Sequence, residues 1–173
     1  MRLLTENGHS VTPIMSEAAY GTDTRFGTAE NIRQQIEEAC KRKIIHSIRD
    51  AEPIGPKKMF DVLLVEPCTG NTLAKLANGI TDTAVTMACK SHLRNARPLV
   101  LAVSTNDALS GSAKNIGHLL NCKNVYFVPM RQDDPHNKPR SVVADFSRTL
   151  ETLEAAVKHE QIQPIFDNPQ SGK

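Results

Sequence analysis

The 173-residue sequence lacks several features that would point directly to a function. Its formal net charge is only +2 and it holds no cluster of Lys and Arg, so nothing indicates a nucleic-acid surface. It has no run of about 18 apolar residues. Its first ten residues, MRLLTENGHS, contain no apolar signal-peptide core. We therefore expect a cytoplasmic protein that binds neither nucleic acid nor membranes.

Familiar metal and nucleotide motifs are missing as well. The four cysteines are far apart in the sequence, which fits neither a zinc site nor a disulfide framework and predicts reduced thiols. No two histidines have the spacing of metal ligands, so no metal is expected. The sequence contains no G-x-G-x-x-G, no P-loop and no G-x-S-x-G elbow. A dinucleotide or hydrolase site of these kinds is therefore not predicted.

What the sequence does contain is an alternation of apolar runs and helical patterns. Nearly continuous apolar runs predict strands that are covered on both faces. Three such runs are present, at 60–67, 98–105 and 124–130. A shorter strand is expected before them, at 10–15. Helical spacing follows most of them. The expected helices are 28–41, a segment after Asn71, one capped by Thr81 or Asp82 and ending near Asn95, 112–121, and a last one with its apolar stripe from Phe146 to Val157.

This alternation predicts one α/β domain over residues 1–173, with about 161–173 as a flexible tail. The expected architecture is a three-layer, Rossmann-like (flavodoxin-like) parallel sheet with helices on both faces. Residues 16–27 and 131–141 read as loops.

Three connections of this sheet carry small polar residues. In open parallel sheets, ligands bind beyond the carboxyl ends of the strands, where loops lead into helices. The three connections are MSEAAYGTDTRFG (15–27), EPCTGNT (66–72) and VSTNDALSG (103–111). Exposed backbone N–H groups and helix starts there suit a polar, phosphate-bearing ligand. For the middle connection a plain structural interpretation stays open, in which Thr69 or Asn71 caps a helix and Gly70 makes the turn.

The stretch EPCTGNTLAKLANGITDTAV (66–85) resembles the flavin-binding signature of the homo-oligomeric flavin-containing cysteine decarboxylase superfamily. VSTN (103–106) stands where that superfamily usually has Pro-Ala-Met-Asn, so Asn106 is kept while the proline and methionine are replaced. The resemblance implies the flavodoxin-like fold, flavin mononucleotide (FMN) as cofactor and a homo-oligomer.

Longer stretches narrow the resemblance to one family of that superfamily. TDTRFG (22–27), STNDALSG (104–111) and QDDPHNKPRSVVAD (132–145) are similar to the B subunits of dipicolinate synthase. This implies an oxidoreductase subunit that acts with an A subunit, which would carry NAD(P). Together they would oxidise dihydrodipicolinate, formed from 4-hydroxy-tetrahydrodipicolinate, to dipicolinate during sporulation. The expected compartment is the cytoplasm of the mother cell.

The resemblance also implies roles for individual residues. The residues expected to bind FMN are Ser16, Thr69, Gly70, Asn71, Thr72 and Ser104. Asn106 is expected to face the flavin ring or the substrate, across a subunit boundary or within one chain. Arg25 is the leading candidate for holding a substrate carboxylate, because an arginine fork binds two oxygens at once. Lys75, Arg131 and Arg140 are weaker candidates.

Two departures from the superfamily keep other functions open. Pro53 occupies the place of the histidine that the decarboxylases need for catalysis, and proline cannot transfer a proton. The superfamily also opens with a strand and a phosphate-binding loop, whereas this chain begins about half-way through the following helix, so we expect that first strand to be missing. The alternatives are a non-catalytic subunit that assembles the same complex, and a flavin-dependent decarboxylase or prenyl-flavin transferase relative.

Overall fold

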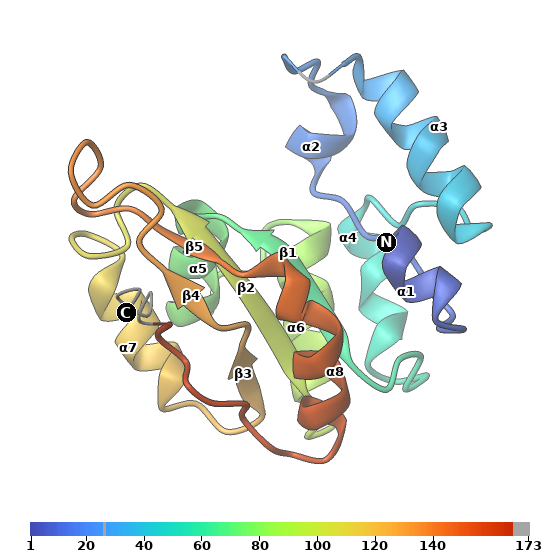
Figure 1. Cartoon of the computed structure of the whole chain (residues 1–173). Helices are drawn as coiled ribbons and strands as arrows, with labels where there is room; N and C mark the ends of the chain where they lie inside the picture. Colours follow the sequence, from blue (N-terminus) through green and yellow to red (C-terminus); the bar gives the residue numbers. More distant parts are fainter. Residues whose placement is uncertain (26, 168–173) are drawn as a thin grey trace.

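The structure is a computed structural model and describes residues 1–25 and 27–167 (Figure 1). The chain begins with four α-helices and a short 3-10 helix before its first strand. These are α1 (Arg2–Glu6), α2 (Glu17–Gly21), α3 (Ala29–Cys40), α4 (Ile48–Ala51) and η1 (Glu52–Ile54). Strands and helices then alternate. They are β1 (Leu63–Cys68), α5 (Gly70–Ala77), α6 (Ala84–Leu93), β2 (Leu99–Thr105), α7 (Ala113–Leu120), β3 (Val125–Phe127), β4 (Met130–Arg131), β5 (Val142–Ala144), η2 (Phe146–Arg148) and α8 (Thr149–Val157).

Strand β2 is the centre of the sheet. It pairs in parallel with β1 on one side and with β3 on the other, in a register that aligns Leu99 with both Leu63 and Val125. The last part of β2 pairs antiparallel with β5, and β5 pairs antiparallel with β4. The sheet is thus parallel from β1 through β2 to β3, as expected, and antiparallel at this end, because the run 124–130 divides into β3 and β4 and a hairpin returns beside β2.

Two apolar layers enclose this sheet, one on each face. Successive side chains of a strand point to opposite faces. Thus Leu101 and Val103 pack in the cluster formed with α4, η1, α5, α6 and α7, whereas Val100 and Ala102 pack in the cluster formed with α8. Residues 99–103 are all fully buried. The nearly continuous apolar run of this segment is explained by cover on both faces, as its sequence predicts.

Threonine side chains set the starts of three helices. Thr28 caps α3 and Thr69 caps α5, each accepting a hydrogen bond from a backbone N–H of the first turn. Helix α6 starts at a capping box formed by Thr83 and Thr86. The expected cap at Thr81 or Asp82 is therefore wrong by one or two positions. Asp82 instead forms an ion pair with Lys75, with 2.8 Å between Nζ and Oδ1.

Residues 10–15, expected to form a strand, do not join the sheet. Their single β contact is a parallel bridge between Ile14 and Ile45, and Pro13 has no N–H with which to extend a ladder. Helix α2, which the sequence did not predict, begins just after this segment with Ser16 as its cap. In Figure 1, α2 and α3 stand at one end of the molecule, away from β4, β5 and α7.

The stretch that follows α8 is partly attached to the sheet. The Gln161 side chain accepts a hydrogen bond from the Phe127 N–H at 2.7 Å and donates one to the Phe127 carbonyl at 2.8 Å. Backbone bonds also join Met130 to Ile165 and Asp167. Residues 161–167, where the sequence predicted a flexible tail, are thus hydrogen-bonded to the sheet in the structure, and 168–173 lie outside the described residues. Among the described residues, no helix is long and apolar enough to span a bilayer.

Candidate functional site

A polar cleft of about 370 Å³ lies where β2 ends, between the start of α5 and the β4–β5 hairpin. Eight residues line it: Thr69, Gly70, Ser104, Thr105, Asn106, Asp133, Ser141 and Val143. This is the carboxyl-terminal edge of the parallel strands, where open α/β sheets bind ligands. Its walls come from segments that are far apart in the sequence.

The first wall is the turn from β1 into α5. Thr69 caps α5 by accepting from the Thr72 N–H at 3.5 Å, so the plain structural interpretation of this turn is correct in part. Gly70 allows a close approach to the loop after β2. A Cβ built there would lie 2.8 Å from Thr105 Oγ1, a distance that real Cβ atoms essentially never show. It would also lie 3.0 Å from Asp107 Oδ1, which is closer than most real Cβ contacts. The turn thus has both a capping role and a position in the cleft.

The second wall is the loop after β2, which Asp107 organises. Its carboxylate accepts hydrogen bonds from the hydroxyl groups of Thr105 and Ser112. These bonds, that of Thr105 first, hold the pKa of Asp107 below its ordinary value, because they stabilise the charged form. The loop therefore keeps a negative charge close to the start of α5.

The third wall is the β4–β5 hairpin, which the sequence did not predict. It contributes Asp133, Ser141 and Val143 to the cleft. The Ser141 hydroxyl is buried and lies 3.3 Å from Asn106 Oδ1. A hydrogen bond from Ser141 is the main reason that the pKa of Asp133 is lowered. The short apolar run at 142–144 was the available signal for β5, but residues 131–141 read as a loop before a helix.

The structure brings some of the predicted site residues together and leaves others apart. Thr69, Gly70, Ser104 and Asn106 all line the cleft. Asn71 and Thr72 lie in the first turn of α5 but are not among the lining residues.

Two predicted residues lie elsewhere. Ser16 caps α2, accepting from the Ala19 N–H at 3.3 Å. Arg25 lies on the exposed segment between α2 and α3, which Figure 1 shows well away from the β4–β5 hairpin. Neither lines the cleft. Their roles at the site stay predictions.

Among the cleft's lining residues in the described part of the chain, Asp133 is charged and none is Lys or Arg. Lys138, which does not line the cleft, forms an ion pair with Asp133, with 3.4 Å between Nζ and Oδ2. Of the weaker cationic candidates, Lys75 is paired with Asp82. Within the described residues no group of His, Cys, Asp or Glu is arranged to hold a metal ion.

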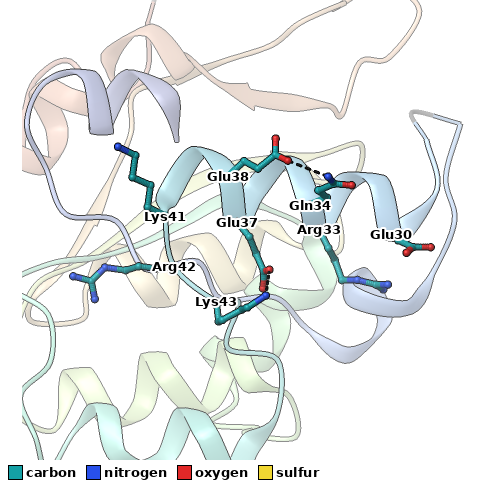
Figure 2. Close-up of a pocket in the computed structure, with 8 residues that line it drawn as sticks. All are labelled: Glu30, Arg33, Gln34, Glu37, Glu38, Lys41, Arg42 and Lys43. Carbon is teal, nitrogen blue, oxygen red and sulfur yellow. Dashed lines mark hydrogen bonds and ion pairs between the residues drawn. The ribbon is translucent and has the colours of Figure 1, made fainter.

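A second depression, of about 570 Å³, lies along α3 and the residues after it (Figure 2). Its walls carry both signs of charge, and Glu37 pairs with Lys43 at 2.7 Å while Lys41 and Arg42 point away from that pair. The ion pair lowers the pKa of Glu37 and raises that of Lys43. None of the predicted site residues lies here, so the cleft beside β2 is the candidate site.

Comparison with known proteins finds relatives in the family that the sequence resembles. The family model described as Flavoprotein matches residues 1–151. The B subunit of dipicolinate synthase from Bacillus subtilis (strain 168) is 43% identical over 163 residues, which cover 94% of this chain and 82% of that protein. The crystal structure of the B subunit of dipicolinate synthase from Bacillus halodurans C has a TM-score of 0.89 and 41% identity, with 96% of this chain and 86% of that chain covered.

A more distant structure shares the fold alone. The FMN-dependent cysteine decarboxylase SpaF has a TM-score of 0.55 at 18% identity, with 86% of this chain and 98% of that chain covered. The flavodoxin-like architecture, with helices on both sides of a mixed, largely parallel sheet, is thus confirmed, as is the resemblance to dipicolinate synthase B subunits. This chain belongs to the flavoprotein family.

Proposed function

We propose that this chain acts as the B subunit of a dipicolinate synthase. With an A subunit that carries NAD(P), it would oxidise dihydrodipicolinate to dipicolinate in the mother-cell cytoplasm during sporulation. The observation that carries the proposal is the high identity, over almost the whole chain, with proteins described as that subunit. The cleft beside β2 supplies a place where such a subunit could hold a ligand.

We propose FMN as the ligand of this cleft. The hydroxyl groups of Thr69, Ser104 and Thr105 and the amide of Asn106 can exchange hydrogen bonds with the ring edge and the ribityl hydroxyl groups of a flavin. A bound flavin would supply two-electron redox chemistry. The protein residues would orient the ring by these hydrogen bonds. The lining residues offer no cationic partner for the phosphate, so they fit the uncharged parts of FMN best.

A titration tests the cofactor proposal. FMN added to the purified chain should show a shifted absorption band and quenched fluorescence. Asn106→Ala and Ser104→Ala should each weaken binding by about tenfold, the value of one lost hydrogen bond. Asn121→Ala, an exposed change at the end of α7, is the matched control. Failure of the unmodified chain to take up FMN would refute the flavin assignment.

One specific observation favours a second function, a non-catalytic subunit that assembles the A subunit. None of the described residues that line the cleft is Lys or Arg, so none of them can pair with the two carboxylates of a dicarboxylate substrate. Rates of dipicolinate formation by the A subunit alone and by the A subunit with this chain distinguish the two functions. If Asn106→Ala leaves the stimulation unchanged while the complex still forms, the assembly function is correct.

The substrate-binding role of Arg25 is a separate proposal. Because it lies outside the cleft of its own chain, Arg25→Ala should abolish product formation only if the segment between α2 and α3 reaches a substrate in the assembled complex. The thermal unfolding of this variant should match that of the unmodified chain. Unchanged product formation would remove Arg25 from the site.

A further inference from the structure

The carboxylate of Asp107 is held in one fixed position beside the cleft. Oδ1 accepts a hydrogen bond from the Thr105 hydroxyl, and both oxygens lie 3.0 Å from the Ser112 hydroxyl. Two glycines make room for the carboxylate. A Cβ at Gly70 would lie 3.0 Å from Oδ1, and a Cβ at Gly111 would lie 3.3 Å from Oδ2. Since Thr105 and Gly70 line the cleft, the carboxylate stands against two of the residues that form it.

No cation neutralises this carboxylate through an ion pair. Asp107 takes part in none of the ion pairs found in the described residues, whereas Asp133 is paired with Lys138. The hydroxyl groups of Thr105 and Ser112 lower the pKa of Asp107, so the group is ionised at neutral pH. Asp107 therefore places a fixed negative charge at this end of the cleft.

An anionic group of a ligand meets two costs here. It gives up water without gaining a cationic partner, because none of the lining residues in the described chain is Lys or Arg. It is also repelled by Asp107, because salt does not fully screen like charges that are closer than about 10 Å. Uncharged polar groups avoid the repulsion and can exchange hydrogen bonds with the hydroxyl-bearing walls. We propose that Asp107 is a specificity-determining residue that excludes phosphate and carboxylate groups from the end of the cleft formed by Thr69, Gly70 and Thr105.

This end of the cleft is thereby reserved for an uncharged polar part of the ligand. For a flavin that part is the ribityl chain or the ring edge, so riboflavin should bind about as tightly as FMN. The statement about flavins rests on the proposed function. The exclusion of anions does not, because the charge of Asp107 and the hydrogen bonds that fix it lie within the chain itself.

The test compares riboflavin and FMN, which differ only in the phosphate, on the unmodified chain and on Asp107→Asn. The asparagine oxygen can still accept from Thr105 and Ser112, so the substitution removes the charge and keeps the shape. At low salt the ratio of the two dissociation constants should shift by about threefold to fivefold in favour of FMN. The shift should vanish at about 1 M NaCl, where the screening length is about 3 Å. A residue that only kept the loop in shape would change both affinities equally.

Asp61→Asn is the matched control. It removes the same charge just before β1, at the edge of the sheet opposite to the cleft, and Asp61 does not line the cleft. It should leave the ratio unchanged. Two results would overturn the role of Asp107. One is binding of FMN to the unmodified chain more than tenfold tighter than riboflavin, and the other is an unchanged ratio in Asp107→Asn.

Inorganic phosphate separates this inference from the flavin proposal. The backbone amide signals of residues 69–71, followed by nuclear magnetic resonance of the ¹⁵N-labelled chain, should respond more strongly to sodium phosphate in Asp107→Asn than in the unmodified chain. If neither flavin binds, the flavin proposal is refuted and the phosphate response decides. A stronger response in Asp107→Asn then keeps the role of Asp107, and equal responses overturn it.

Discussion

Replacement of Gly70 by alanine tests the close approach on which the cleft depends. A Cβ at this position would lie 2.8 Å from Thr105 Oγ1, 3.0 Å from Asp107 Oδ1 and 3.2 Å from Ser112 Oγ. These oxygens are already hydrogen-bonded to one another. They cannot move away from the new methyl group without loosening the bonds that hold Asp107.

The magnitude follows from two opposing effects. Overpacking of a filled site costs about 1–3 kcal/mol. Alanine in place of glycine reduces the freedom of the unfolded chain, which returns about 0.5–1 kcal/mol. Taking the middle of each range, the net expectation is a loss of about 1 kcal/mol in the free energy of unfolding, or a melting temperature lower by about 2–4 °C for a chain of this size. Calorimetry or circular dichroism on heating measures this change.

Gly117 provides a control with the opposite sign. It lies inside α7, is exposed, and a Cβ there would meet nothing within 4 Å. Gly117→Ala should therefore raise the free energy of unfolding by about 0.5–1 kcal/mol. If Gly117→Ala stabilises as expected while Gly70→Ala is neutral or stabilising, the close approach between α5 and the loop after β2 is wrong.

Three further changes test other parts of the fold. Gln161→Ala leaves the N–H and carbonyl of Phe127 without their partners, so the free energy of unfolding should fall by about 1–3 kcal/mol in a denaturant titration; an unchanged midpoint would contradict the attachment of 161–167 to β3. Gly55→Ala places a Cβ 2.6 Å from the backbone oxygen of Ser91, so overpacking between the end of η1 and α6 should lower the melting temperature. An unchanged melting temperature would contradict this close contact between Gly55 and Ser91. Burial lowers the pKa of His92, so the unfolded chain takes up a proton near pH 6.5 that the folded chain refuses. Stability is therefore full above that pH and falls as the pH drops through the folded pKa, and His92→Gln should flatten this dependence.

Much of the fold could be predicted from the sequence because burial leaves a direct trace in it. A strand covered on both faces must be apolar at nearly every position, and β1, β2 and β3 lie almost entirely inside the runs that predicted them. Helix starts could also be predicted where a threonine precedes an apolar stripe, as at Thr28. The exceptions are short elements. Helix α2 and strands β4 and β5 have two to five residues each, too few for any period to show.

The candidate site divides in the same way. Thr69, Gly70, Ser104 and Asn106 could be named because small polar residues directly follow buried strands there and because those connections resemble the flavin-binding signature. Asp133 and Ser141 were not assigned to the cleft, because their place depends on a hairpin that returns from far along the chain to pair with β2. Neither residue has a local pattern that would point to this pairing.

By itself the sequence determined the layers, the strands of the parallel part and the edge at which polar residues collect, because these follow from which side chains avoid water and from where loops must lie. Tertiary structure alone decided that Asp107 stands against the start of α5, that the β4–β5 hairpin closes the cleft, and that Arg25 lies outside it. The physical reason is the separation along the chain over which each effect acts. Hydrophobic periodicity acts between neighbours in the chain, whereas the charge and shape of a cleft depend on side chains that only the folded backbone brings within hydrogen-bond distance.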